Sequence, residues 1–401
     1  MTDLKIAQGS RLSYSKCYLN DIGKVIQIQN KKLIQLDQKK KLIEVEAGMT
    51  FGDLHNILIS KNLFFPVMPG HPAITVGGGV ASNCHGKNPG RDGTIKKWIK
   101  GISLSIGNKI IKTTKKSNSK LFNMTIGGLG LTGIIKSVQL MVIPLEGKSF
   151  FIHSFKIYTV DLLLKKLEKN FYKHDLCYAW VDLNKKMYDK KKINSIFFGG
   201  KFSKKKIYKK YSVKKLFPYN KIFDFYSSGL ASIFNYIYFT KEVSKKKFHQ
   251  SIFDSLFPLN RLNWIYALFG PKGHEEYQII CPFENFKGVL EKIRSLISNN
   301  RIVVPLCSLR VFYGDSKFLQ FDGKGIGLGI SFSGPDANLL VNFLNQICAR
   351  NAYKLYISKR RSLDPLTFNS SYPDAKRFKY YRDHFGLSNK FQSNLSYALK
   401  I

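Results

Sequence analysis

The sequence is poor in acidic residues and has no closely spaced pair of cysteines. Only 26 of its 401 residues are Asp or Glu, against 65 Lys or Arg, and the formal net charge is +39. The six cysteines form no C-x-x-C pair, which argues against both a disulfide framework and a structural zinc site. We therefore expect no bound metal.

Targeting and membrane-spanning signals are also lacking. The first residues, MTDLKIAQGS, do not contain the apolar core of a signal peptide. The best candidate for a membrane segment, residues 222–239, is interrupted by Asp224, Ser227 and Asn235 and is too polar to span a bilayer. It either lies on a surface or belongs to the core. We expect a cytoplasmic protein that reaches the membrane, if at all, peripherally at its inner face.

The excess of lysine has two readings. It is either a compositional bias shared with the abundant Ile, Asn and Phe, or a surface that attracts phosphates, lipid head groups or nucleic acid. No zinc-finger spacing, RNP-like aromatic signature or basic heptad is present, so we expect no nucleic-acid partner. Residues 185–247 are lysine-dense with interleaved aromatic residues and predict an insertion, either a solvated loop or a lipid-facing segment.

The pattern of apolar residues changes along the chain. Up to about residue 145 it predicts strands, a helix that starts at Thr50, and a hairpin turn at Gly107. Further on, strands joined by short turns alternate with helices, including a helical apolar stripe over residues 283–300 and a last strand KLYISK at 354–359. This arrangement predicts an antiparallel sheet covered by helices, and so an α+β fold.

Three glycine-containing turns lie in the first 135 residues, at 7–15, 77–79 and 127–133. The run GLGLTG at 128–133 matches G-x-G-x-x-G, but an alternating β-branched segment follows it where a Rossmann site requires a helix. We therefore reject a Rossmann dinucleotide site. Exposed amides in such turns bind phosphate oxygens, so three of them favour a large cofactor that carries phosphate.

The segments FPVMPGHPAITVGGGVASNCHGKN and LFNMTIGGLGLTGII resemble the flavin-binding segments of the vanillyl-alcohol oxidase/para-cresol methylhydroxylase (PCMH) superfamily. Together with YAWVD, GPKGHEEYQIICP and KLYISK, they resemble more narrowly its decaprenylphosphoryl-β-D-ribose 2′-oxidase family. The resemblance implies a PCMH-type FAD-binding domain at 1–145, shortened at its N-terminus, and a substrate or cap domain at 146–358. Residues 359–401 would return to the flavin domain.

The resemblance also assigns site residues. The expected FAD contacts are Gly9, Arg11, Ser13, Tyr14, Pro69, Gly70, Thr75, Val76, Gly77, Gly78, Ser82, Asn83, Cys84, His85, Ile134 and Tyr356. Substrate would meet Lys87, Trp180, Gln278 and Tyr356, and the catalytic residues would be His85 and Lys359. On chemical grounds Lys359 would stabilise the charge of the reduced flavin, and His85 would orient the substrate hydroxyl or accept its proton. Packing of His85 against the flavin, a solvent-facing Lys87 and a core position for Trp180 are the alternatives.

The function that the resemblance implies is oxidation of a CH–OH group of a sugar by FAD, on a polyprenyl-phosphate-linked ribose at its 2′ position, in cell wall biosynthesis. A separate NAD-dependent short-chain dehydrogenase would then reduce the product ketone. Aldonolactone and alditol oxidases share the fold, and a basic lipid-binding protein without flavin is a further alternative. Gly327 and Gly329 stand where the family carries Asn and Cys, which leaves the substrate open. Because the family has a further segment before its pyrophosphate loop, we expect either that this chain binds FAD weakly or that an upstream extension or a partner polypeptide completes the FAD domain.

Overall fold

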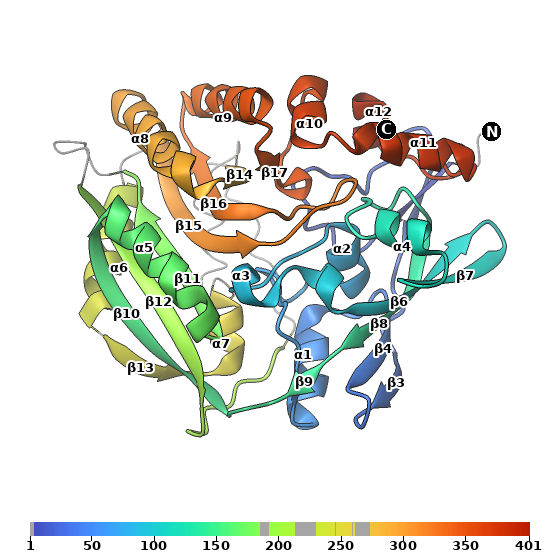
Figure 1. Ribbon diagram of the computed structural model, residues 1–401, viewed down its shortest axis with the longest axis horizontal. Coiled ribbons are helices and arrows are strands. Elements are labelled where there is room, and N and C mark those ends of the chain that lie inside the picture. Colours follow the sequence, from blue (N-terminus) through green and yellow to red (C-terminus); the bar gives the residue numbers. More distant parts are fainter. Residues whose placement is uncertain (1–3, 185–191, 213–229, 245, 259, 261–272) are drawn as a thin grey trace.

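The computed structural model describes residues 4–184, 192–212, 230–244, 246–258, 260 and 273–401. Figure 1 shows two sheet-containing halves side by side, with the C-terminal helices running along the top of both. In the first half, an antiparallel five-stranded sheet has the order β3-β4-β8-β6-β7. Its strands are β3 (Leu33–Asp37), β4 (Leu42–Glu46), β6 (Ile99–Ile106), β7 (Lys109–Thr114) and β8 (Ile134–Met141).

Short elements surround this sheet. Strand β1 (Lys5–Gln8) pairs in parallel with β2 (Lys24–Gln27), and β5 (Leu63–Phe64) pairs with β9 (Ile143–Pro144). The helices are α1 (Phe51–Ser60), α2 (Val76–Ala81), α3 (Pro89–Asp92) and α4 (Ser119–Thr125), with a 3-10 turn at Ile95–Lys97. The predicted N-cap is confirmed, because the Thr50 hydroxyl accepts a hydrogen bond from the backbone N–H of Asp53 at 3.1 Å. The predicted hairpin turn is confirmed as well, with Gly107 at φ 60° between β6 and β7.

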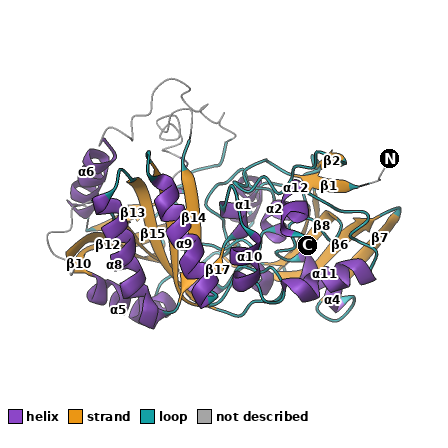
Figure 2. Cartoon of the chain, turned by 90° about the horizontal axis from the view of Figure 1, so that it is seen from above, coloured by secondary structure: helices purple, strands orange, loops and turns teal. Residues whose placement is uncertain are grey.

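The second half is built on an antiparallel sheet of order β13-β10-β12-β11-β15-β16-β14-β17. Its strands are β10 (Ser149–Thr159), β11 (Leu176–Asp182), β12 (Lys192–Ser203), β13 (Lys247–Gln250), β14 (Glu275–Cys281), β15 (Val303–Tyr313), β16 (Lys324–Ser333) and β17 (Lys354–Leu355). Helices α5 (Val160–Asn170), α8 (Phe283–Asn299) and α9 (Ala337–Asn351) cover one face (Figure 2). The predicted helix-covered antiparallel sheet is thus confirmed.

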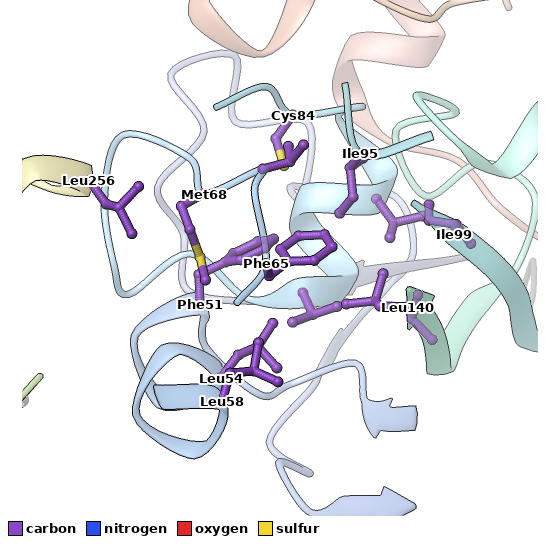
Figure 3. Close-up of a cluster of buried hydrophobic side chains, with 14 of the residues drawn as sticks. Phe51, Leu54, Leu58, Phe65, Met68, Cys84, Ile95, Ile99, Leu140 and Leu256 are labelled. Atoms are coloured by element: carbon purple, nitrogen blue, oxygen red, sulfur yellow. The ribbon is translucent and has the colours of Figure 1, made fainter. Parts of the chain in front are cut away.

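The opposite face of this sheet packs against the first half. Helices α6 (Leu230–Ser244) and α7 (Ile252–Leu256) lie there, and the cluster in Figure 3 contains Phe51 and Leu54 from α1 together with Leu256 from α7. Phe51 stacks on Phe65 with ring centroids 6.3 Å apart. Because fully burying one such side chain contributes about 1.5–3 kcal/mol, this shared core holds the two halves in one arrangement.

The predicted insertion at 185–247 needs correction. Residues 192–203 form β12, which pairs with β10 on one side and β11 on the other, so this part is a central strand of the sheet. Its apolar residues, including Ile196 and Phe197, are buried on both faces. The flanking lysines concealed the strand in the sequence. Residues 185–191, 213–229 and 245 of the predicted insertion lie outside the described residues.

The C-terminal residues return to the first half. Helices α10 (Pro365–Ser371), α11 (Ala375–His384) and α12 (Asn394–Leu399) pack in one cluster with Ile6, Leu129 and Leu131. The Arg382 side chain donates a hydrogen bond to the Leu131 carbonyl oxygen, and Lys5 bridges to Phe391. The glycine turns of the first half are therefore held from both ends of the chain.

Candidate active site

A cavity of about 980 Å³ lies between the two halves. Sixteen of the twenty predicted site residues line it: Gly9, Arg11, Ser13, Tyr14, Pro69, Gly70, Thr75, Gly77, Gly78, Ser82, Cys84, His85, Lys87, Gln278, Tyr356 and Lys359. They come from distant parts of the chain and from both halves. Their convergence on one space is a property of the tertiary structure.

Backbone hydrogen bonds fix the glycine turn that begins at Thr75. The Gly77 N–H donates to the Ala47 carbonyl, and the Thr75 hydroxyl accepts from the Gly78 N–H at 3.1 Å. A Cβ added to Gly9 would stand 2.5 Å from the Thr75 hydroxyl, so the first glycine turn approaches the second closely. A Cβ on Gly70 would meet nothing within 4 Å, and one on Gly78 would meet only that hydroxyl at 3.0 Å. Gly70 and Gly78 thus present bare backbone to the cavity; we call this region the glycine end.

Four predicted residues do not line the cavity. Val76 is in the core, Asn83 is buried and donates to the Phe321 carbonyl, and Ile134 lies between two residues that do line it. Trp180 is next to cavity-lining Ser308 across the sheet, but its ring packs against Tyr238 and Phe239 of α6. Trp180 is therefore covered by α6, which agrees with the alternative prediction that it is a core residue.

A second set of lining residues, which we call the sheet end, consists of Lys87 and of Gln278, Ser308, Arg310 and Gly329 from the large sheet. The register of the sheet sets their arrangement, because Gln278 is paired with Gly329 and Gly329 with Ser308. Directly paired residues of neighbouring strands point to one face. Phe312, further along the same face of β15, packs edge-on against His85 and occupies the space that a Cβ on Gly327 would need.

His85 is held as one neutral tautomer. Its Nδ1 lies 3.0 Å from the Gly86 carbonyl oxygen, which can only accept, so Nδ1 carries the proton. Its Nε2 lies 2.7 Å from the Gln278 side-chain nitrogen, and Nε2 therefore accepts that hydrogen bond. Burial, with the Arg310 charge as the next cause, lowers the pKa of His85 to about 3. Both ring nitrogens are thus engaged, and this arrangement favours an orienting role over proton transfer.

The buried neutral form of His85 gives the protein an expected pH dependence. Its pKa is lowered from 6.5 to about 3, so the unfolded chain binds the proton more readily and stability falls as the pH drops below 6.5. His85→Asn should remove this contribution, roughly 2 kcal/mol at pH 5 relative to neutral pH. Urea unfolding of the variant at pH 5 and pH 7.5 measures it, with the exposed His384→Asn as the control. An equal pH dependence in the two variants would contradict the assignment.

Lys359 reaches the cavity because the predicted last strand is short. Strand β17 ends at Leu355, and a 3-10 turn at Ile357–Lys359 follows, so KLYISK is not one strand. On a regular strand Tyr356 and Lys359 would face opposite sides, whereas the turn lets both line the cavity. The Lys359 ammonium lies 2.8 Å from a Glu276 carboxylate oxygen. Although burial opposes its ionisation, the Lys359 charge holds the pKa of Glu276 below its ordinary value.

The sequence analysis did not predict four residues that surround the sheet end: Glu276, Ser308, Arg310 and Phe312. Strand alternation contained a signal for them. Glu276 lies two residues before Gln278, and Ser308, Arg310 and Phe312 alternate along one strand, so each set shares a face. What the alternation did not indicate was which face would point to the cavity.

The cavity is suited to a flavin dinucleotide. Its bare backbone at the glycine end suits a pyrophosphate, and Arg11 and Lys16 add positive charge there. The Lys359 ammonium, which also lines the cavity, suits a ring that gains negative charge on reduction. The predicted strand after GLGLTG is confirmed as β8, which excludes a Rossmann arrangement at this turn.

Comparison with known proteins agrees with this geometry. Residues 4–109 match the FAD binding domain family. The chain is 24% identical over 99% of its length to decaprenylphosphoryl-beta-D-ribose oxidase of Mycolicibacterium smegmatis, and the match covers 89% of that protein. D-lactate dehydrogenase of Anaerostipes hadrus and L-gulonolactone oxidase of Mus musculus are each 29% identical over 28% of this chain, which is 25% and 26% of their own lengths.

The protein is an FAD-dependent oxidoreductase that acts on CH–OH groups. Within that class, the matched residues 4–109 are an FAD-binding domain, and the glycine turns of this chain resemble those of PCMH-type oxidases. When bound, FAD supplies the acceptor for two electrons and a hydrogen from the substrate carbon. The residues that would hold this cofactor line the glycine end, and His85, Gln278 and Lys359, which would orient the hydroxyl and face the reacting groups, line the same cavity.

Proposed function

We propose that the protein oxidises the 2′ hydroxyl of a polyprenyl-phosphate-linked ribose to the keto sugar. The observation that carries this proposal is the match to decaprenylphosphoryl-beta-D-ribose oxidase, which extends over 99% of the chain and so includes the cap domain as well as the FAD domain. The matches to lactate and gulonolactone enzymes cover about a quarter of those proteins. The second half of the chain contributes Gln278, Ser308 and Arg310 to the cavity, so these residues would set the substrate specificity.

A short-chain ribosyl phospholipid tests the proposal. Holoprotein mixed without oxygen with farnesyl-phosphoryl-β-D-ribose should lose its flavin absorbance, and the product should be the 2′-keto sugar by mass spectrometry. L-Gulono-1,4-lactone and D-lactate are the comparison substrates, and we expect them to reduce the flavin at least about 100-fold more slowly, the scale on which unpaired polar groups in a site reject an analogue. Faster reduction by gulonolactone would favour the aldonolactone alternative, for which the small Gly329 leaves room.

The lipid tail of such a substrate raises the question of a membrane contact. No described helix is long and apolar enough to cross a bilayer. Helix α6, however, exposes Ile233, Phe234, Tyr236 and Ile237 to between 41% and 64% of their full accessible area. Asn235 on its inner side donates hydrogen bonds to Asp182 and to the Val304 carbonyl oxygen, which fixes the helix over β15.

We propose that this exposed face of α6 contacts an anionic lipid surface. A protein of net charge +39 is attracted to anionic head groups, and isoleucine and tyrosine side chains suit the interface below them. The position also fits a lipid-linked substrate. Val304, whose carbonyl oxygen holds α6, and Leu306, which lines the cavity, are two residues apart in β15.

Vesicle binding should depend on this face. The protein should sediment with phosphatidylglycerol-containing vesicles and be released by salt, because the attraction is screened. Ile233→Ser with Ile237→Ser should weaken sedimentation roughly tenfold, because each side chain loses part of its burial in lipid. The control is Leu366→Ser, which changes an exposed leucine on α10. Equal binding to neutral vesicles, or no loss in the double variant, would contradict the proposal, as would dimerisation through this face in solution.

A further inference from the structure

Two cationic side chains face the sheet end without a carboxylate partner. Lys87 is only 7% exposed, and its ammonium forms no hydrogen bond or ion pair among the described residues. Arg310 donates one hydrogen bond, from Nη1 to the Ser308 hydroxyl at 3.1 Å, and its buried Nε has no partner among the described residues. Both side chains line the cavity.

The charge balance of the cavity makes this pair unusual. Among the described residues that line it, Glu276 is the single carboxylate, and Lys359 already pairs with Glu276 at 2.8 Å. Arg310 and Lys359 both repel a proton on Lys87, so the like charges are close enough to act on one another. The Glu276 charge acts on Arg310 without forming an ion pair with it. Burying cations without an ion-pair partner is costly, and an anionic ligand removes that cost.

We infer that Lys87 and Arg310 bind the phosphate group of the substrate. The inference rests on the proposed function and extends it by naming the residues and the recognised group. A guanidinium presents a planar set of donors that matches phosphate oxygens, and an ammonium adds a compact charge beside it. The pyrophosphate of FAD has its own place at the glycine end, where Gly9 meets Thr75, so the pair at the sheet end is left for a second anion.

The surroundings of the pair suit a phosphodiester between a sugar and a lipid. His85 and Gln278, which line the same cavity, are joined by a hydrogen bond and can orient a hydroxyl. The face of β15 that carries Arg310 continues through Ser308 to apolar Leu306. A sugar, a phosphate and an apolar chain would therefore find polar, cationic and apolar side chains within one cavity.

Phosphate binding should be accompanied by proton uptake. Burial, followed by the Arg310 and Lys359 charges, lowers the pKa of Lys87 well below its ordinary value, and a bound phosphate would raise it again. Calorimetric titration of the holoprotein with farnesyl phosphate, in buffers that differ in ionisation enthalpy, measures the protons taken up. The uptake should disappear in Lys87→Met.

The deciding experiment titrates holoprotein with farnesyl phosphate, methyl phosphate and D-lactate, and follows the spectrum of the bound flavin. Lys87→Met and Arg310→Met should each weaken binding of both phosphates roughly tenfold to 100-fold, the usual scale for losing a charged hydrogen bond. FAD content should stay unchanged. The controls are Lys100→Met and Arg350→Met, which remove exposed charges of the same types. Tighter binding of farnesyl than of methyl phosphate would support a lipid-linked source, and equal binding a soluble phosphate ester.

Three outcomes would overturn the inference: unchanged phosphate affinity in both variants, loss of FAD from them, or binding of D-lactate as tight as that of methyl phosphate. Loss of FAD would assign the pair to the cofactor. The result is separable from the proposed function. A holoprotein that binds farnesyl phosphate through this pair but is not reduced by farnesyl-phosphoryl-ribose would contradict the proposed reaction and leave the phosphate site in place.

Discussion

Lys359→Ala should slow reduction of the bound flavin by substrate roughly 100-fold or more while FAD stays bound. Removing one preorganised donor that stabilises developing charge usually has an effect of this size. FAD should remain because the glycine end, whose bare backbone suits its phosphates, lies on other segments. Stopped-flow mixing without oxygen measures the reduction rate, and flavin absorbance per protein after gel filtration measures retention.

The ion pair with Glu276 complicates this variant and also supplies its controls. Lys359→Ala leaves a carboxylate, 16% exposed, without its cation, and that charge alone could disturb the site. The double variant Lys359→Ala/Glu276→Gln removes the charge and should be as slow as the single one. Lys359→Arg should restore little of the reduction rate, because a planar guanidinium does not replace a compact ammonium. Reduction at the wild-type rate in the double variant would exclude Lys359 from the mechanism.

Gly78→Leu should weaken FAD binding roughly 100-fold, the second large effect that we expect. A Cβ at this position meets only the Thr75 hydroxyl, so the larger side chain extends into the cavity rather than into the protein. Overpacking a filled space costs about 1–3 kcal/mol, which corresponds to this loss of affinity. Flavin retained through gel filtration and a titration of the apoprotein with FAD both measure it.

Gly288→Leu is the matched control for that variant. Gly288 is an exposed glycine of α8 with nothing within 4 Å of an added Cβ, and it lies outside the cavity. This substitution should leave FAD binding unchanged and should stabilise the helix slightly, by about 0.5–1 kcal/mol. Wild-type retention of FAD in Gly78→Leu, with the thermal unfolding midpoint unchanged, would place the pyrophosphate elsewhere in the cavity.

Local features of this chain were predictable from its sequence because they depend on neighbouring residues. The Thr50 cap, the Gly107 turn and the apolar stripe of α8 each follow from hydrogen bonds or periodicity within a few positions. The strand after GLGLTG was predictable for the same reason, since the alternation of its β-branched residues excludes a helix. The resemblance to the flavin-binding segments also made the residues of the glycine end predictable, because glycines there leave the backbone accessible to a phosphate.

The tertiary structure decided the features that depend on distant contacts. The lysines that flank β12 in the sequence are typical of a solvated loop. Because β12 pairs with a strand on each edge, it is nevertheless a central strand of the sheet. Trp180 has the right register to line the cavity, and only the docking of α6 covers it.

The pairing of charges in the site was likewise decided by the tertiary structure. Glu276 pairs with Lys359 only because β17 ends early and a 3-10 turn follows, and Arg310 is buried beside Lys87 only because the two halves close over them. The glycine turns of the sequence indicated a cofactor that carries phosphate, because such a turn consists of consecutive residues. The resemblance of these segments to flavin-binding segments then indicated FAD and the class of reaction. Which charges remain unpaired around the substrate was decided by the packing of the two sheets, because charge compensation is a property of space and not of sequence order.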